Sequence, residues 1–504
     1  MKRILPITLT ATLLASCTVG PNYKRPTDLT PPAFKEAAGW STAAPGDLLD
    51  KGPWWTLFND PVLNDLCARI EVSNQNVAAA VAALEQSQAL VREARAGLFP
   101  TLDVTPAVTQ SGGGGSNGTI ITSGGGTGNS SGGGTTGTGT GNGNTGSSTI
   151  GSAGSGTRYR LTGGASWEPD LWGRVRRTVE QAKGNAAASA ADLAAARLSA
   201  QSTLATDYIQ MRSLDAEIDL TVETGKSYDR ALQITSNRYN AGVSAKTDLL
   251  QAQTQVASTR GDLAELVRQR GVLEHAIAVL TGEAPSTFVI QHAAWAPVVP
   301  VVPAELPSTL LQRRPDIASA ERRVAAANAG IGIAVAAFFP NLTLTGSVGQ
   351  SATSIGNLFN GSAFLWSLGA SLAQSVFDGG LVRGQVAAAR ATWRESVATY
   401  RQTVLAALQD TEDQLIGARQ LAVTTTLRQA ASSAADETEK LTLNQYLAGQ
   451  VDYTTVVTVQ ATALNARRTL VTAVANQQAT SVGLIRALGG SWETTYRTPP
   501  PPAG

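Results

Sequence analysis

The chain has 504 residues and a formal net charge of +1, and only 15% of its residues are charged, against roughly 25% in an ordinary soluble domain. This balance gives no electrostatic reason to expect a nucleic acid as a partner. Two histidines and two cysteines make a histidine-based metal site, a Ser-His-Asp apparatus or a disulfide framework a poor expectation. The composition therefore points away from an enzyme, and no cofactor is expected.

Residues 1–16 are predicted to be a lipoprotein signal peptide. Lys2 and Arg3 give a positive n-region, and the apolar stretch over 4–15 is too short to span a bilayer. It ends at Leu14-Ala15-Ser16-Cys17, which resembles the lipobox of bacterial lipoproteins. We therefore expect Cys17 to carry a covalent lipid (diacylglycerol and palmitate), an anchor stabilised by about 0.8 kcal/mol per buried methylene. The alternative is an ordinary signal peptide with a chance cysteine.

Residues 17–60 are then expected to form an N-terminal lipid-anchored segment. Residue 18 is threonine rather than aspartate. In Gram-negative lipoproteins this pattern indicates transport onward to the outer membrane. The predicted location is therefore the outer membrane of a Gram-negative bacterium.

The rest of the chain is a tandem duplication. Residues 96–102 return at 336–342 with an offset of 240, and the sequence around Arg238–Gly242 returns near Gln445–Gly449 with an offset of 207. The offset changes within a run of Gly, Ser, Thr and Asn that contains no charged residue. The predicted organisation is a first repeat over 61–284 with a Gly-rich extracellular insertion at 111–157, a linker over 285–314, a second repeat over 315–490 and a disordered tail over 491–504.

Each repeat is expected to contain long helices. Residues 62–97 are rich in good helix formers and are stopped by Pro100. The next proline-free stretch permits a helix from about 173 to 237, about 100 Å long at 1.5 Å per residue. Its apolar residues recur every three or four positions, as a coiled-coil seam requires: Leu204, Tyr208, Met211, Leu214, Ile218 and Val222.

Each repeat should also contain two strands. Four runs of about ten residues alternate apolar and polar side chains, the pattern and length of a tilted membrane strand. They lie at about 101–110, 158–168, 341–350 and 364–374. Trp167 and Trp366 suit an interfacial aromatic girdle. Four strands cannot close a barrel, and an open edge in lipid leaves backbone groups unsatisfied. Two chains must therefore contribute for eight strands, or three for twelve, and a conducting lumen favours three.

Three separated motifs resemble those of TolC-type outer membrane factors, and most closely the NodT subgroup of efflux lipoproteins. They are Gly20-Pro21-Asn22-Tyr23-Lys24-Arg25-Pro26, Trp54-Trp55 through Phe58-Asn59-Asp60-Pro61, and Arg313-Arg314-Pro315-Asp316-Ile317. The resemblance implies an α+β membrane protein with long coiled-coil helices and four transmembrane β-strands per chain. It implies a homotrimer that forms a twelve-stranded β-barrel in outer-membrane lipid and a helical barrel across the periplasm.

The resemblance further implies the outer-membrane channel-tunnel of a tripartite efflux system. Such a channel is a passive exit duct for drugs or small toxic molecules, which an inner-membrane efflux pump delivers through a periplasmic adaptor protein. Two alternatives stay open: the exit duct of a type I protein secretion system, and a lipid-anchored coiled-coil protein with no pore.

The resemblance also assigns roles to the two helix turns. Tyr239–Gly242 and Tyr446–Gly449 resemble the periplasmic tips, where adaptors dock and the pore closes. Glycine suits such a reversal because it tolerates positive φ. Tyr446 resembles an aromatic gate position, with simple packing as the alternative.

Acidic residues near these turns are the candidate gate. Asp248 resembles an acidic position that can line the entrance, where three copies would form a cation-selecting ring. A helix cap or an interaction with the helix dipole is an equally open interpretation. In the second repeat, the positions where the family frequently has acids hold Thr455 and Thr458. Asp452 lies closer to the turn and need not replace them.

Overall fold

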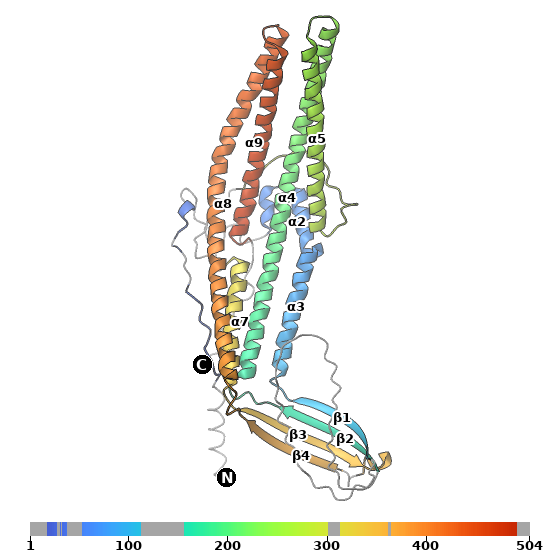
Figure 1. Ribbon diagram of the computed structural model, residues 1–504, viewed down its shortest axis with the longest axis vertical. Coiled ribbons are helices and arrows are strands. Elements are labelled where there is room, and N and C mark those ends of the chain that lie inside the picture. Colours follow the sequence, from blue (N-terminus) through green and yellow to red (C-terminus); the bar gives the residue numbers. More distant parts are fainter. Residues whose placement is uncertain are drawn as a thin grey trace. The chain divides into compact units, whose positions relative to one another are not determined.

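The structure is a computed structural model that describes residues 18–27, 31, 33–37, 53–111, 156–300, 313–360 and 364–490. The predicted signal peptide, Cys17, most of the Gly-rich insertion and the predicted tail lie outside the described residues. The chain divides into two units, shown in Figure 1. The helical unit includes the described residues up to Ala96, Trp172–Phe338 and those from Phe377 onward. The sheet unit comprises Gly97–Leu171 and Phe339–Val376, within the described ranges.

The helical unit is built from two copies of one arrangement. The first copy contains α3 (Gln75–Ala96), α4 (Arg174–Asn240) and α5 (Lys246–Leu280), and the second contains α7 (Pro315–Ala336), α8 (Leu381–Leu447) and α9 (Tyr453–Ala487). Corresponding helices have equal lengths: 22 residues in α3 and α7, 67 in α4 and α8, and 35 in α5 and α9. The predicted tandem repeat of long helices is confirmed.

The two long hairpins of this unit are α4 with α5 and α8 with α9 (Figure 1). Helix α4 also packs against α3, α7 and α9, and α7 packs against α8. Within the described residues, no helix is both long enough and apolar enough to cross a membrane.

One helix expected from the sequence is two helices in the structure. Residues 62–97 divide into α2 (Pro61–Ser73) and α3, and Asn74 stands between them with a β-region ψ of 122°. The Asn74 side chain accepts a hydrogen bond from Val77 N (3.0 Å) and donates one to Leu280 O (2.7 Å). Asn74 thus caps α3, as asparagine readily does. The composition of good helix formers hid this break.

The main hydrophobic core surrounds the middle of α4. Buried residues of η3 (Trp54–Phe58), α2, α4, the end of α5 and the end of α9 form it. Cys67 is buried there as a free thiol, and Tyr208 donates a hydrogen bond to Asp60 Oδ2 (2.8 Å). The predicted seam is buried at Leu204, Tyr208 and Met211. Farther along, Val222 is exposed.

The N-terminal segment is held against α4 and α7. The buried guanidinium of Arg177 donates hydrogen bonds to Val19 O (3.3 Å), Gly20 O (3.4 Å) and Asn22 Oδ1 (2.8 Å). Gly20 has a φ of +95°, and a Cβ at this position would lie 2.5 Å from Gly332 Cα. Glycine is therefore required where the two backbones meet, which explains the first residue of the motif that begins at Gly20.

The Arg313–Ile317 motif is a clamp at the start of α7. Arg314 forms ion pairs with Asp316 (2.9 Å) and Asp410 (3.2 Å), and it donates a hydrogen bond to Ala487 O (3.0 Å). It therefore ties the beginning of α7 to α8 and to the last residue of α9.

The sheet unit contains four antiparallel strands in the order β1-β2-β3-β4. They are β1 (Thr101–Ser111), β2 (Gly156–Trp167), β3 (Asn341–Ala352) and β4 (Phe364–Ala373), with η4 (Ile355–Asn357) between the last two. The register Thr101↔Ser166, Ser166↔Thr345 and Thr345↔Gly369 continues across all four strands. Since side chains alternate along each strand, every row of partners lies on a single face.

The two faces of this sheet differ sharply. One face carries Leu102, Val104, Leu161, Leu344, Val348, Trp366, Leu368 and Leu372. It is largely uncovered, and Leu368 is 81% exposed and Trp366 74% exposed. The opposite face carries mainly threonine, serine and glycine, and there the hydroxyls of Ser347 and Ser367 lie 2.8 Å apart. The predicted α+β fold class, with helices and apolar-out strands in one chain, is confirmed.

Candidate functional site

The two helix turns have the same backbone. Gly242 and Gly449 both adopt positive φ, +71° and +75°. Val243 N donates to Arg238 O (2.8 Å), and Gln450 N donates to Gln445 O (2.9 Å), so each helix ends with the same six-residue backward hydrogen bond. Among the described residues, no atom beyond the adjacent residues of the chain lies within 4 Å of a Cβ built on either glycine, so backbone conformation alone requires glycine in these turns.

The first turn leaves its tyrosine and its acid accessible. Tyr239 is 37% exposed. The N-cap of α5 is Ala245, whose side chain makes no capping bond, and Asp248 lies in the first turn of that helix. The Asp248 carboxylate accepts a hydrogen bond from Ser244 Oγ (2.7 Å). Asp248 is therefore not the N-cap, but it is a negative charge at the positive end of a helix, where it is favourable.

The second turn uses its acid as a cap. Asp452 is the N-cap of α9, and its Oδ1 accepts hydrogen bonds from Thr455 N (2.8 Å) and Thr455 Oγ1 (2.5 Å). These two donors hold the pKa of Asp452 below its usual range. Thr458 donates to Thr454 O (2.9 Å). The threonines at the expected acidic positions are thus engaged in local hydrogen bonds.

Tyr446 belongs to a cluster that brings the two turns together. It is 9% exposed and packs with Ala252, Tyr453 and Val456. Its ring centroid lies 5.7 Å from that of Tyr453, and the guanidinium carbon of Arg238 lies 5.4 Å from its ring centroid. We call these five residues the turn cluster; it joins the end of α4 and the start of α5 to the end of α8 and the start of α9.

Burial in the turn cluster also shifts the pKa of Tyr453. The pKa of Tyr453 is raised to about 12, mainly by burial and further by the nearby Tyr446, Tyr228 and Asp248. Thr454 Oγ1 of the same helix end donates to Gln251 Oε1 (3.2 Å). The structure therefore places Asp248, Tyr446 and Asp452 at adjoining ends of their helices, while Tyr239 stays outside the cluster.

A buried ionic network lies farther along α4 and was missed from the sequence. Asp215 is fully buried, and its carboxylate pairs with Arg212 (2.9 Å) and Arg270 (2.6 Å). These arginines also donate to the carbonyls of Gln291 (2.8 Å) and Ile290 (2.7 Å). The two guanidinium groups compensate the buried negative charge of Asp215. Through their hydrogen bonds to the carbonyls, they also hold residues 290–291, which follow α5, against α4 and α5. The only signal in the sequence was a charged residue within an apolar seam.

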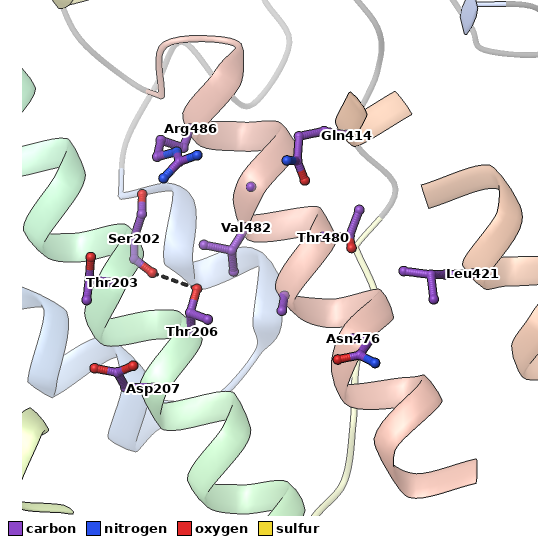
Figure 2. A pocket seen from close by; sticks show the side chains of 12 residues that line it. Ser202, Thr203, Thr206, Asp207, Gln414, Leu421, Asn476, Thr480, Val482 and Arg486 are labelled. Atoms are coloured by element: carbon purple, nitrogen blue, oxygen red, sulfur yellow. Dashed lines mark hydrogen bonds between the residues drawn. The ribbon is translucent and has the colours of Figure 1, made fainter. Parts of the chain in front are cut away.

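A polar cavity of about 560 Å³ lies between α4, α8 and α9 (Figure 2). Its walls carry hydroxyl, amide and charged side chains, among them Ser202, Thr206, Asp207, Gln414, Asn476, Thr480 and Arg486. Burial raises the pKa of Asp207. Residues 202, 203, 206 and 207 of α4 face the cavity, whereas Leu204 and Tyr208 face the hydrophobic core. The cavity therefore lies on the face of α4 turned away from that core, where a polar lining can hold water.

The described residues contain no group of three or more His, Cys, Asp or Glu side chains placed to hold a metal ion. Three features of the described residues remain as candidates for function. They are the two glycine turns joined by the turn cluster, the polar cavity between α4, α8 and α9, and the sheet with one apolar face.

Comparison with known proteins adds the following. The model of the outer membrane efflux protein family matches residues 66–283 and 306–490. The antibiotic efflux pump outer membrane protein ArpC of Pseudomonas putida is 28% identical over 495 residues, covering 97% of this chain and 96% of ArpC. Nodulation protein T of Rhizobium leguminosarum bv. viciae is 29% identical over 484 residues, covering 95% and 92%. The solved structure of the outer-membrane channel OprN is 26% identical, with a TM-score of 0.81 over 94% of this chain and 99% of OprN.

Proposed function

This chain belongs to the outer membrane efflux protein family, and we propose that it forms a homotrimeric exit duct for drugs or small toxic molecules. It is the outer-membrane channel of an efflux system, a transport conduit and not an enzyme. In this proposal an inner-membrane pump supplies the energy, and a periplasmic adaptor docks at the helix turns. The duct itself is passive.

The observation that carries the trimer is the open sheet. Its apolar face is uncovered, and within the described residues β1 and β4 each pair on one side only. In lipid these free edges must pair, because their backbone groups have no water to bind. β1 and β4 have nearly equal lengths, 11 and 10 residues, so β4 of one copy can pair with β1 of the next. Three copies give twelve strands with the threonine and serine face inward, and a barrel of that size leaves a lumen.

The test is to insert purified protein into a planar bilayer. We expect a heat-resistant trimer on gels and stepwise single-channel conductance. A properly folded trimer that never conducts would contradict the duct and would favour a lipid-anchored coiled-coil protein with no pore.

The proposed cargo is small. The relative ArpC is described as an antibiotic efflux pump component, and this supports small molecules over the secreted proteins of a type I system. Deleting the chromosomal gene in the native host should increase accumulation of a fluorescent dye and sensitivity to antibiotics. Unchanged accumulation, together with loss of a secreted protein from the medium, would favour protein secretion.

The proposed gate lies at the first turn. Asp248 is half-exposed beside the turn cluster, so three copies would bring three carboxylates near one axis. Asp248→Ala should then change the bi-ionic reversal potential and the conductance. Asp248→Glu, which keeps the charge, should retain the wild-type potential. If Asp248 serves only the helix dipole, the alanine variant should cost about 0.3–1 kcal/mol of local stability and leave the potential unchanged.

The proposed lipid anchor is Cys17, and the contacts of the next residues support it. Val19 N donates to Trp172 O (3.1 Å), and Thr18 lies against Gly173, the N-cap residue of α4. The residue that follows Cys17 is therefore held at the beginning of α4. Cys17→Ser should abolish palmitate incorporation and signal processing. Undiminished labelling in that variant would refute the lipid assignment.

A further inference from the structure

The four strands of the sheet unit and the segments that connect them in pairs carry almost no charge. Residues 101–167 and 341–373, which contain the four strands and the segments that connect β1 to β2 and β3 to β4, include only three charged residues. They are Asp103 on β1 and Arg158 and Arg160 on β2. Each of these few charges therefore has a large influence on the field around the sheet.

The strand register places all three charges on the polar face. Arg160 is opposite Ala107 on β1 and Ser351 on β3, and Arg158 is opposite Thr109. Asp103 is opposite Gly164. These rows alternate with those of Leu102, Val104, Tyr159 and Leu161 on the apolar face. All three charged residues are exposed in the single chain.

The two arginines and the aspartate lie at different ends of the strands. Gly164, the partner of Asp103, is four residues from Arg160 and six from Arg158, or about 13 and 20 Å at 3.3 Å per residue. Both separations exceed the Debye length of about 8 Å at physiological ionic strength. The Asp103 carboxylate also folds over its own partner, since its Oδ2 would lie 2.8 Å from a Cβ on Gly164. Asp103 therefore does not neutralise the arginines.

The strands and the segments that connect them contain no other acidic residue. The segment from 111 to 157 contains no charged residue, and neither does 353–363. Within the described residues no carboxylate forms an ion pair with Arg158 or Arg160. Their neighbours on the polar face are short, namely Ala107, Thr109, Thr162 and Ser351, and both arginines are exposed.

We propose that Arg158 and Arg160 form a basic collar that selects anions. The collar lies at the insertion side of the duct, by which we mean the end where β1 leads into the Gly-rich insertion and β2 begins. The inference rests on the proposed trimer, in which the polar face lines the lumen and three copies supply six guanidinium groups. A ring of fixed positive charge raises the local concentration of anions and opposes cations. Guanidinium groups also bind carboxylates and phosphates through paired hydrogen bonds. The collar therefore favours passage of solutes that carry a carboxylate or phosphate.

The first test measures reversal potentials of single channels in a KCl gradient. Arg158→Gln with Arg160→Gln should lower the anion-to-cation permeability ratio several-fold relative to wild type. Arg158→Lys with Arg160→Lys keeps the charge and should retain the wild-type ratio, which separates charge from a packing defect. Asp103→Asn removes the one acidic charge of the strands and should shift the ratio slightly in the opposite direction. Each variant is first checked for the heat-resistant trimer.

The second test uses tripolyphosphate as a blocker added to each side of the bilayer in turn. In wild type, block should be stronger from the insertion side, and the double glutamine variant should lose it. Equal reversal potentials for wild type and the double glutamine variant, with both trimers conducting, would overturn the collar and leave the duct intact. Wild-type trimers that do not conduct would overturn the duct itself, and the collar with it.

Discussion

The α4–α5 turn and the α8–α9 turn have kept one backbone and acquired different side chains. Their glycines have nearly the same φ, and the helices that flank them have equal lengths. Yet Tyr239 is exposed, whereas its counterpart Tyr446 is buried under Arg238. The acid of the first turn is a half-exposed charge, and that of the second is occupied as a helix cap. The two repeats therefore share the backbone geometry of the turn but differ in side chains. The second turn supplies the buried tyrosine, and the first supplies the exposed acid.

The largest difference between the turns should appear on removing the two tyrosines. Tyr446→Ala empties the turn cluster and should cost about 3 kcal/mol of local stability, as for other buried aromatics. Tyr239→Ala removes an exposed side chain and should change stability by less than about 0.5 kcal/mol. Hydrogen exchange at the amides of both turns measures these changes. Equal effects would show that the two turns do not differ in packing.

The glycines should instead respond alike. Gly242→Ala and Gly449→Ala each force an L-residue into positive φ, at a cost of about 1–2 kcal/mol. Space is not limiting at either position, so the two costs should agree. Thermal unfolding of each variant, with the double variant as a test of additivity, checks this. A much larger cost at one turn would mean that the shared backbone is under different constraints.

Arg238 allows the asymmetry to be reduced by a single substitution. The second repeat has Gln445 at the corresponding position, so Arg238→Gln makes the two turns alike. Loss of the cation–π contact with Tyr446 should cost about 0.5–1 kcal/mol. Arg238→Lys, which keeps a cation, is the matched control and should lose less. The exchange rate of the Tyr446 amide distinguishes them, and equal rates in both variants would exclude a role for the cation.

The smallest expected effect is the pH dependence of the second turn. Because the folded pKa of Asp452 is lowered, its contribution to stability is fully present above the ordinary value of 3.8 and is lost as pH falls through the lowered value. Asp452→Asn keeps a good cap without a titrating charge and should remove this dependence. Protection of the Thr455 amide, corrected for intrinsic exchange, provides the measurement. A wild-type profile that matches the asparagine variant would contradict it.

What the sequence predicted well depended on local or repeated patterns. The two offsets located the duplication, and period-two alternation located four strands and their two faces. The resemblance located the two turns, and the positive φ of Gly242 and Gly449 explains why glycine suits them.

What the sequence did not predict depended on residues far apart in the chain. Asn74 breaks a run of helix formers through a bond to Leu280, some 200 residues away. Tyr446 meets Arg238 only after both hairpins have formed. The seam that reads as continuous in the sequence is covered at Leu204 but exposed at Val222, because covering depends on which elements pack there. The spacing of apolar residues shows which face of a helix is apolar, but it does not show which element packs against that face.

The close approach of Gly20 to Gly332 imposes an order on the maturation of the chain. The N-terminal segment is made first, but the helix that receives it, α7, is made some 300 residues later. The contacts of Arg177 and Asn328 with this segment likewise require α4 and α7 to be side by side. Non-local contacts of this kind form late, after the loop between them has closed. The segment that begins at Thr18 is therefore among the last parts of the helical unit to be fixed.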